Sequence, residues 1–218
     1  MSTDLTTLLQ QAGALQTGND QVFDAISKSA DYFGRVQLFG GKAAAVLEGK
    51  IPMAHWGYLE SKDAITDIGE TFEALVLGYR PLASRLNTDP VTAVYDHASD
   101  EFKAIMAESE IEDSGCVYGP EFFLYVPSVE KFATYHMNSK TARKVAPQVK
   151  SLIGKAAKFK AKLIKTAKYT WHGPEVLPSN SPLSIPAHEV VMENLNKFLN
   201  PQKPEAPKEQ TTTETRDR

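Results

Sequence analysis

The segment KFKAKLIKTAKYTW, residues 158–171, carries the side chains best suited to hold a ligand. On a β-strand, Lys158, Lys160 and Lys162 point to one face, and the apolar residues between them point to the other. Ammonium groups on one face of a strand lie about 6–7 Å apart, which is similar to the phosphate spacing along a single nucleic-acid strand. The alternation therefore indicates a cationic face that follows a phosphate backbone.

Aromatic residues follow these lysines directly. Tyr169 and Trp171 share a parity with Lys165, opposite to that of the first three lysines, unless a bulge resets the alternation. Cations for the backbone and aromatic rings for the bases are what a single-strand binding groove needs. The alternative is a strand whose lysines only face water and whose Tyr169 and Trp171 fill the core.

The charge of the whole chain is polarised. Between residues 139 and 170 there is no Asp or Glu, whereas the rest of the chain carries 14 basic against 27 acidic residues. The ten basic residues of this block are Lys140, Arg143, Lys144, Lys150, Lys155, Lys158, Lys160, Lys162, Lys165 and Lys168. Such a block attracts polyanions through counterion release. A solvated face that balances acidic neighbours is the other interpretation.

Two further segments supply candidates for the same groove. The stretch 120–138 has aromatic residues at both parities, so one set is expected to lie outside the core. Arg80 lies on a long β-like segment, residues 70–87, that we expect beside it. The predicted nucleic-acid contacts are Arg80, Tyr125, Tyr135, Arg143, Lys144, Lys158, Lys160, Lys162, Lys165, Lys168, Tyr169 and Trp171.

Signatures of catalysis are absent from the sequence. There is no nucleotide-binding glycine loop, zincin motif or serine-hydrolase elbow, and the five histidines are far apart. The single cysteine, Cys116, follows acidic residues that raise the pKa of its thiol. The sequence thus predicts a non-enzymatic protein with no cofactor and no metal. A nuclease that uses metal ions held by the acids of the first half is the weakest alternative.

The elements expected to position these residues are mostly strands. Leucine spacing predicts a helical N-terminal arm over 1–31, which either packs on the domain or makes a homo-oligomer. Residues 32–200 read as short strands with helices over 99–109, 139–156 and 187–200. Residues 201–218 lack aromatic and large aliphatic residues and predict a disordered tail. We therefore expect an α+β fold, mainly β, built on a small antiparallel barrel.

The segments FEALVLGYRPLA, FFLYVPSVEKFATYH and KAKLIKTAKYTWHGP carry a family resemblance. Over residues 35–185 the chain resembles bacteriophage single-stranded-DNA-binding proteins of the OB-fold type. The resemblance implies a five-stranded antiparallel barrel that holds single-stranded DNA during replication or recombination, without catalysis, beside replication or recombination proteins. Many such proteins end in an acidic tail tipped by an aromatic residue. Here the last 18 residues are charge-neutral and end in Arg218, which puts that mode of partner recruitment in doubt.

Other features bear on where the protein acts. No apolar run is long enough to span a bilayer, and the N-terminus has no secretory signal, so we expect no membrane contact. One cysteine fits a cytoplasmic protein, in the host cytoplasm if it is viral.

The main rival to DNA binding is a protein-interaction or virion structural module whose basic face docks an acidic partner.

Overall fold

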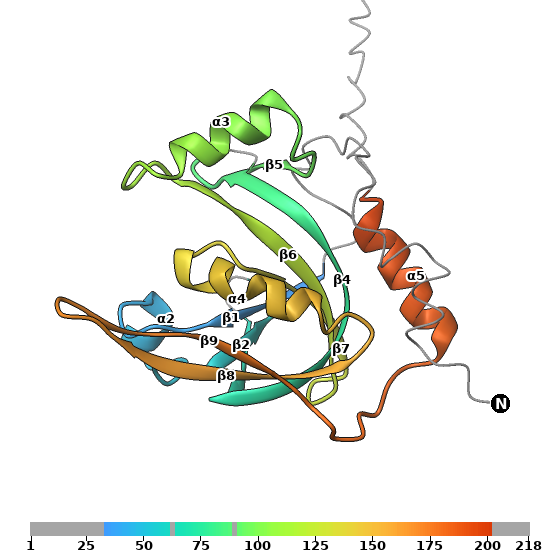
Figure 1. The fold of residues 1–218 in the computed structure, drawn as a ribbon. Helices are drawn as coiled ribbons and strands as arrows, with labels where there is room; N and C mark the ends of the chain where they lie inside the picture. Colours follow the sequence, from blue (N-terminus) through green and yellow to red (C-terminus); the bar gives the residue numbers. More distant parts are fainter. Residues whose placement is uncertain (1–32, 62–63, 89–90, 202–218) are drawn as a thin grey trace, which may run out of the picture.

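A computed structural model describes residues 33–61, 64–88 and 91–201 of the chain. They form one strongly curved sheet with four helices, which confirms an α+β fold that is mainly β (Figure 1). The predicted N-terminal arm, residues 1–31, lies outside the described residues, as does the predicted tail except for its first residue, Pro201.

The sheet has nine strands, and a closed five-stranded barrel is not what the described residues form. The order across the sheet is β3-β2-β1-β7-β6-β4-β8-β9, with β5 paired to β4. The strands are β1 (Gly34–Leu38), β2 (Trp56–Leu59), β3 (Ile65–Gly69), β4 (Thr71–Arg85), β5 (Thr92–Val94), β6 (Cys116–Val126), β7 (Lys131–His136), β8 (Ala156–Lys165) and β9 (Thr170–Pro178). All neighbours are antiparallel except β1 and β7, which are parallel. The expected five-stranded barrel is not shown, and β1, β2 and β3 extend the sheet beyond β7.

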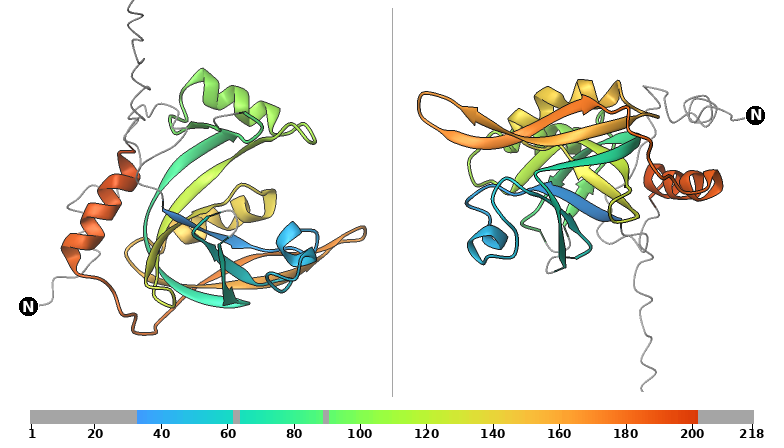
Figure 2. Two further views of the ribbon diagram at one scale, coloured as in Figure 1. Left: turned by 180° about the vertical axis from the view of Figure 1, so that it is seen from behind. Right: turned by 90° about the horizontal axis from the view of Figure 1, so that it is seen from below.

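Strand β4 is the centre of the sheet. Its first part, from Thr71 to Leu75, pairs with β8, and the part from Leu75 to Arg85 pairs with β6. A glycine inside a β-like segment predicts a bulge, and the register shift between Val76 and Gly78 confirms one at Gly78. The bulge lets one long strand turn from one partner to the next, and the sheet curves around its core (Figure 2).

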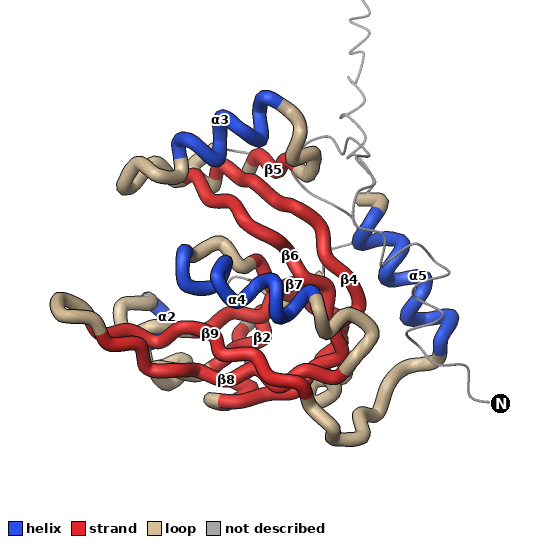
Figure 3. The backbone as a smooth tube through the Cα atoms, viewed as in Figure 1, coloured by secondary structure: helices blue, strands red, loops and turns tan. Residues whose placement is uncertain are grey.

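The helices cover both faces of the sheet. They are α2 (Ala44–Leu47), α3 (Asp100–Glu108), α4 (Lys140–Lys150) and α5 (His188–Leu199), and Figure 3 separates them from the strands by colour. On the concave side, α4 packs Ala142, Ala146 and Val149 into the main core. On the convex side, α5 packs Val191, Leu195 and Phe198 against β4 and β6. The central strands are therefore buried on both faces.

Local signals set the ends of these helices. Ser99 and Ser139 cap α3 and α4, because their hydroxyls accept the backbone N–H of Phe102 and of Ala142 at 3.1 Å each. A proline inside a helical segment predicts a kink or a break, but Pro147 does not end α4, which runs on to Lys150. Capping at Ser139 starts α4 directly after β7 and so brings the basic helix against β9.

Candidate nucleic-acid interface

Strands β8 and β9 form a two-stranded hairpin that extends beyond the rest of the sheet, drawn in orange in Figures 1 and 2. We call residues 156–178 the hairpin arm. Its turn is closed by Thr166, which donates its backbone N–H to the Tyr169 carbonyl at 2.8 Å and accepts the Tyr169 N–H on its hydroxyl at 3.0 Å. The segment singled out in the sequence is thus not one strand but two strands that reverse at 166–169.

The predicted alternation along β8 is confirmed up to Lys160 and ends there, because Ala161 is half-buried and Leu163, expected in the core, is 47% exposed. Ala157 and Phe159 are fully buried in the main core, whereas Lys158, Lys160 and Lys162 are exposed. Phe159 stacks on Phe72 with ring centroids 4.8 Å apart, which fixes the orientation of the strand. We call the three exposed lysines the lysine face.

The parity predicted for Trp171 is wrong, because the chain turns back before it. In the hairpin register, Trp171 lies opposite Ile164 and Gly173 lies opposite Lys162. Opposite residues of an antiparallel pair share a face, so Trp171 lies on the same face as Lys162, at the diagonal position. Diagonal neighbours are about 7–8 Å apart, within the reach of long side chains. The hairpin therefore joins the indole to the lysine face.

Aromatic and aliphatic side chains at the end of the arm are exposed to solvent. Tyr169 is 71% exposed, Leu163 47% and Trp171 37%. Lys165 and Lys168 lie beside them around the turn and are exposed as well. Exposed rings next to cations are an unusual combination on a free surface, and they can stack on the bases of an unpaired strand while the cations hold its phosphates.

Acidic residues partly offset the lysine face. Lys162 donates to Glu175 at 2.5 Å, and this hydrogen bond lowers the pKa of the Glu175 carboxyl. Glu175 also lies opposite Lys160 in the register, and Glu73 of β4 lies opposite Lys158. Within the described part of the chain, four cations of the arm form no ion pair: Lys158, Lys160, Lys165 and Lys168. A cationic surface therefore remains.

A cavity of about 480 Å³ opens beside the arm, between β1, the junction of β7 with α4, and β9. We call it the mouth cavity. Trp171 and His172 line it from β9, Ser139 from the start of α4, and the exposed Arg35 from β1. A side chain at Gly173 would place its Cβ 2.7 Å from the Thr141 Cγ2, so glycine is what lets β9 pass this close to α4. The indole of Trp171 is therefore partly enclosed by the walls of the mouth cavity.

Three predicted contact residues, Arg80, Tyr125 and Tyr135, are buried and are not part of the exposed surface of the arm, although Tyr135 lines the inner wall of the mouth cavity. Tyr135 lies in the main core beside Trp56, and Tyr125 lies under α5, next to Phe132. Burial raises the pKa of both phenols, and Glu130 adds to the rise at Tyr125. Both predictions are wrong because helices cover the two faces of β6 and β7.

Arg80 is also misassigned by the sequence. Its guanidinium pairs with Glu121 at 2.8 Å, donates to the Tyr95 hydroxyl at 3.1 Å, and donates to the carbonyl of Phe198 in α5. The same group lies over the rings of Tyr95 and Phe198, 4.0 and 4.2 Å from their centroids. Arg80 therefore ties α5 to the sheet, and no exposed charge is left to meet a phosphate.

The remaining two candidates lie on α4. Arg143 lies 4.0 Å from the Tyr118 ring centroid and donates to the Tyr118 carbonyl at 3.2 Å and to the Asn138 carbonyl. Lys144 is exposed. The sequence-predicted residues thus fall into three groups, namely the hairpin arm, the basic side of α4, and the buried set of Arg80, Tyr125 and Tyr135.

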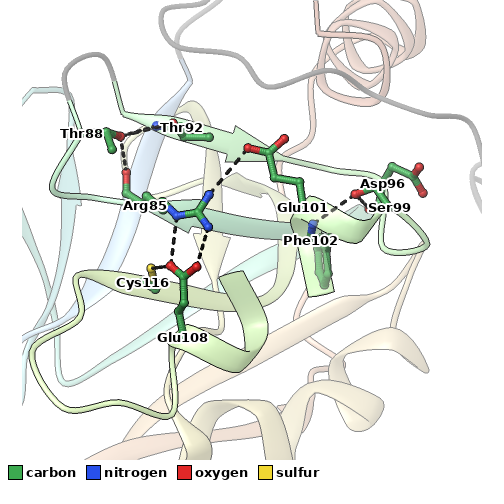
Figure 4. Close-up of polar contacts among 9 residues, drawn as sticks. All are labelled: Arg85, Thr88, Thr92, Asp96, Ser99, Glu101, Phe102, Glu108 and Cys116. Carbon is green, nitrogen blue, oxygen red and sulfur yellow. Dashed lines mark hydrogen bonds and ion pairs between the residues drawn. The ribbon is translucent and has the colours of Figure 1, made fainter. Parts of the chain in front are cut away.

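The one cysteine belongs to the polar cluster that fastens α3 to the sheet (Figure 4). Arg85 donates twice to Glu108, at 3.1 and 2.8 Å, and the Cys116 thiol donates to Glu108 at 3.2 Å. Burial, together with the neighbouring carboxylate, raises the pKa of that thiol. The cluster positions α3 and does not present an activated nucleophile.

Across residues 33–61, 64–88 and 91–201, no three His, Cys, Asp or Glu side chains gather closely enough to hold a metal ion. No helix in these ranges is long and apolar enough to cross a membrane. Comparisons of the chain with protein-family models, with curated proteins and with solved structures find no match.

Proposed function

We propose that this protein binds single-stranded DNA with little sequence specificity and that the hairpin arm is its main contact surface. The observation that carries the proposal is the register of β8 and β9, which puts the lysine face and Trp171 on one face of this hairpin, with Lys158 and Lys160 beside β4 and Trp171 nearer its tip. Lysines neutralise phosphates irrespective of sequence, and stacking accepts any base. Holding DNA during phage-type replication or recombination, beside the proteins of those processes, is the role we infer.

The order of the elements supports this proposal. Strands β4, β6 and β7 form a meander, α4 follows, and β8 and β9 form a hairpin whose first strand pairs back on β4. We infer an OB-like unit in these five strands, to which β1, β2 and β3 are added. OB-folds contact oligonucleotides through the loops after their first and fourth strands. In this chain the loop after the fourth strand is the tip of the hairpin arm.

A gel-shift series tests the function. The full chain is mixed with single-stranded DNA, duplex DNA and RNA of matched length at low salt. We expect retention of the single strand, with an affinity that falls steeply as salt is raised. Retention of none of the three, at any salt concentration, would overturn the proposal and favour a module that docks an acidic protein.

Removal of the indole is expected to weaken binding without unfolding the protein. Trp171→Ala removes a side chain that is 37% exposed, so the fold is expected to persist. Loss of one stacked base costs about 1–3 kcal/mol, or roughly 5- to 150-fold in affinity. Fluorescence anisotropy with a labelled oligonucleotide measures the change, and Trp171→Phe, which keeps a ring, is expected to retain most of the affinity. A Trp171→Ala protein that binds like wild type would contradict a stacking role.

Neutralising Glu175, the carboxylate beside the lysine face, is expected to strengthen binding to single-stranded DNA. Glu175→Gln frees Lys162 from its 2.5 Å partner and removes a negative charge beside Lys160. One additional phosphate contact raises affinity by up to about fivefold at about 0.1 M salt. The matched control is Glu193→Gln on α5, which removes a carboxylate paired with Lys197 at 3.0 Å. Equal affinities of the two variants, measured by the same anisotropy titration, would place the DNA away from the lysine face.

A further inference from the structure

A second concave surface lies between α3 and α4, over β4 and β6. It is an apolar groove of about 380 Å³, which we call the α3–α4 groove. Its lining residues are Tyr79, Pro81, Phe102, Met106, Tyr118, Gly119, Pro120, Arg143, Ala146, Pro147 and Lys150. Figure 1 shows α3 and α4 on the same side of the two strands, with the strands continuing between them.

The floor of this groove offers a flat apolar surface with few hydrogen-bond donors. Pro81 of β4 lies directly opposite Pro120 of β6, and neither proline has an N–H to give. The rings of Tyr79 and Tyr118 flank this pair, and Met106 of α3, which is 39% exposed, forms part of the opposite wall. Such a surface suits a planar ring better than a polar group.

The charged residues of the groove are both cations. The Lys150 ammonium lies 4.0 Å from the centroid of the Tyr79 ring, and the Arg143 guanidinium lies 4.0 Å from that of Tyr118. No carboxylate lines the groove within the described part of the chain, and Glu110, which is not among the lining residues, pairs with Arg143 at 3.9 Å. A ligand that complements these walls combines a flat ring with a negative charge.

We propose that the α3–α4 groove takes an unstacked base of the DNA strand held by the hairpin arm, with the adjoining phosphate near Arg143 and Lys150. Bases stack on tyrosine rings and on guanidinium planes, and ammonium groups pair with phosphates. Helix α4 links the two surfaces, because it packs on β9 while four of its residues line the groove. This inference rests on the proposed binding of single-stranded DNA by the arm, and it extends the site to a second point.

The test compares two oligonucleotide lengths on two variants. Met106→Glu puts a carboxylate on the groove wall, whereas the control Ile111→Glu puts one at a 65% exposed position just after α3, outside the groove. For a single strand of about 20 nucleotides we expect Met106→Glu to lose roughly 5- to 50-fold in affinity. For one of about 6 nucleotides, which the arm alone can hold, we expect both variants to match wild type.

A second readout locates the base directly. An oligonucleotide that carries 5-iododeoxyuridine is irradiated on the wild-type protein, and the cross-linked peptide is identified by mass spectrometry. We expect a cross-link at Tyr118 or Tyr79 that is lost in Met106→Glu but kept in Ile111→Glu.

Three results would overturn the inference. If Met106→Glu binds both lengths like wild type and neither tyrosine cross-links, the groove is no base site while DNA binding by the arm stands. A short peptide that contains acidic and aromatic residues serves as a further probe. If Met106→Glu loses affinity for this peptide and keeps its affinity for DNA, the groove belongs to a protein partner. If wild type binds no oligonucleotide, the proposed function fails as well.

Discussion

Replacing Lys160, Lys165 and Lys168 together by Gln is expected to weaken binding to single-stranded DNA by about 100-fold at about 0.1 M salt. All three side chains are exposed, and none forms an ion pair within the described part of the chain. Each lost phosphate contact lowers the slope of log affinity against log salt by about 0.7, so the slope is expected to fall by about 2. Salt titrations of anisotropy with the full chain measure both quantities.

Gln is preferred to Glu in this experiment because of the acids already present. Glu175 lies opposite Lys160 and Glu73 lies opposite Lys158, so charge reversal would crowd carboxylates along β8 and strain the fold. The matched control replaces Lys103, Lys131 and Lys197, which lie on α3, in β7 and on α5, and changes the net charge equally. If this control lost as much affinity as the arm variant, binding would depend on overall charge and not on the arm.

The second large effect is expected on stability. Arg80→Ala leaves the Glu121 carboxylate buried without its 2.8 Å partner and removes the donors to Tyr95 and to the Phe198 carbonyl. Loss of one partner of a buried ion pair costs about 3–5 kcal/mol. Urea denaturation followed by circular dichroism is expected to show a lower midpoint with an unchanged slope.

Two comparisons make the Arg80 result specific. Arg80→Met combined with Glu121→Leu removes both charges and is expected to recover much of the lost stability, because no unpaired charge stays buried. Arg35→Ala changes an exposed arginine and is expected to leave the free energy of unfolding nearly unaltered. An Arg80→Ala protein of wild-type stability that has lost DNA binding would restore Arg80 to the interface and contradict its structural role.

The sequence predicts the structure best where the conformation of a segment depends only on residues near it in the chain. The period-two pattern of β8 is local, because Phe159 and Lys160 are sorted only by which face of the strand is buried. A serine directly before a helical segment predicts a cap, and a glycine inside a strand predicts a bulge. Ser99, Ser139 and Gly78 confirm these local signals. The alternation alone therefore suffices to place Lys158, Lys160 and Lys162 on one exposed face.

Contacts between distant segments cannot be predicted in this way. Arg80 meets the Phe198 carbonyl across 118 residues, and nothing near Arg80 in the sequence reveals that partner. An aromatic strand usually has one open face, which is why Tyr125 and Tyr135 are expected to be exposed, but α5 and α4 cover both faces of β6 and β7. The parity of Trp171 depends on a turn at Thr166–Tyr169 that contains neither Gly nor Pro.

Tryptophan fluorescence tests the central claim most directly, because the chain has only two tryptophans and Trp56 is fully buried in the core. The full chain is titrated with an unlabelled single-stranded oligonucleotide at low and at high salt. We predict quenching at low salt that disappears at high salt and is absent from Trp171→Phe at either concentration. An emission that stays unchanged at low salt, while Trp171 remains exposed, would contradict a hairpin arm that stacks on unpaired DNA.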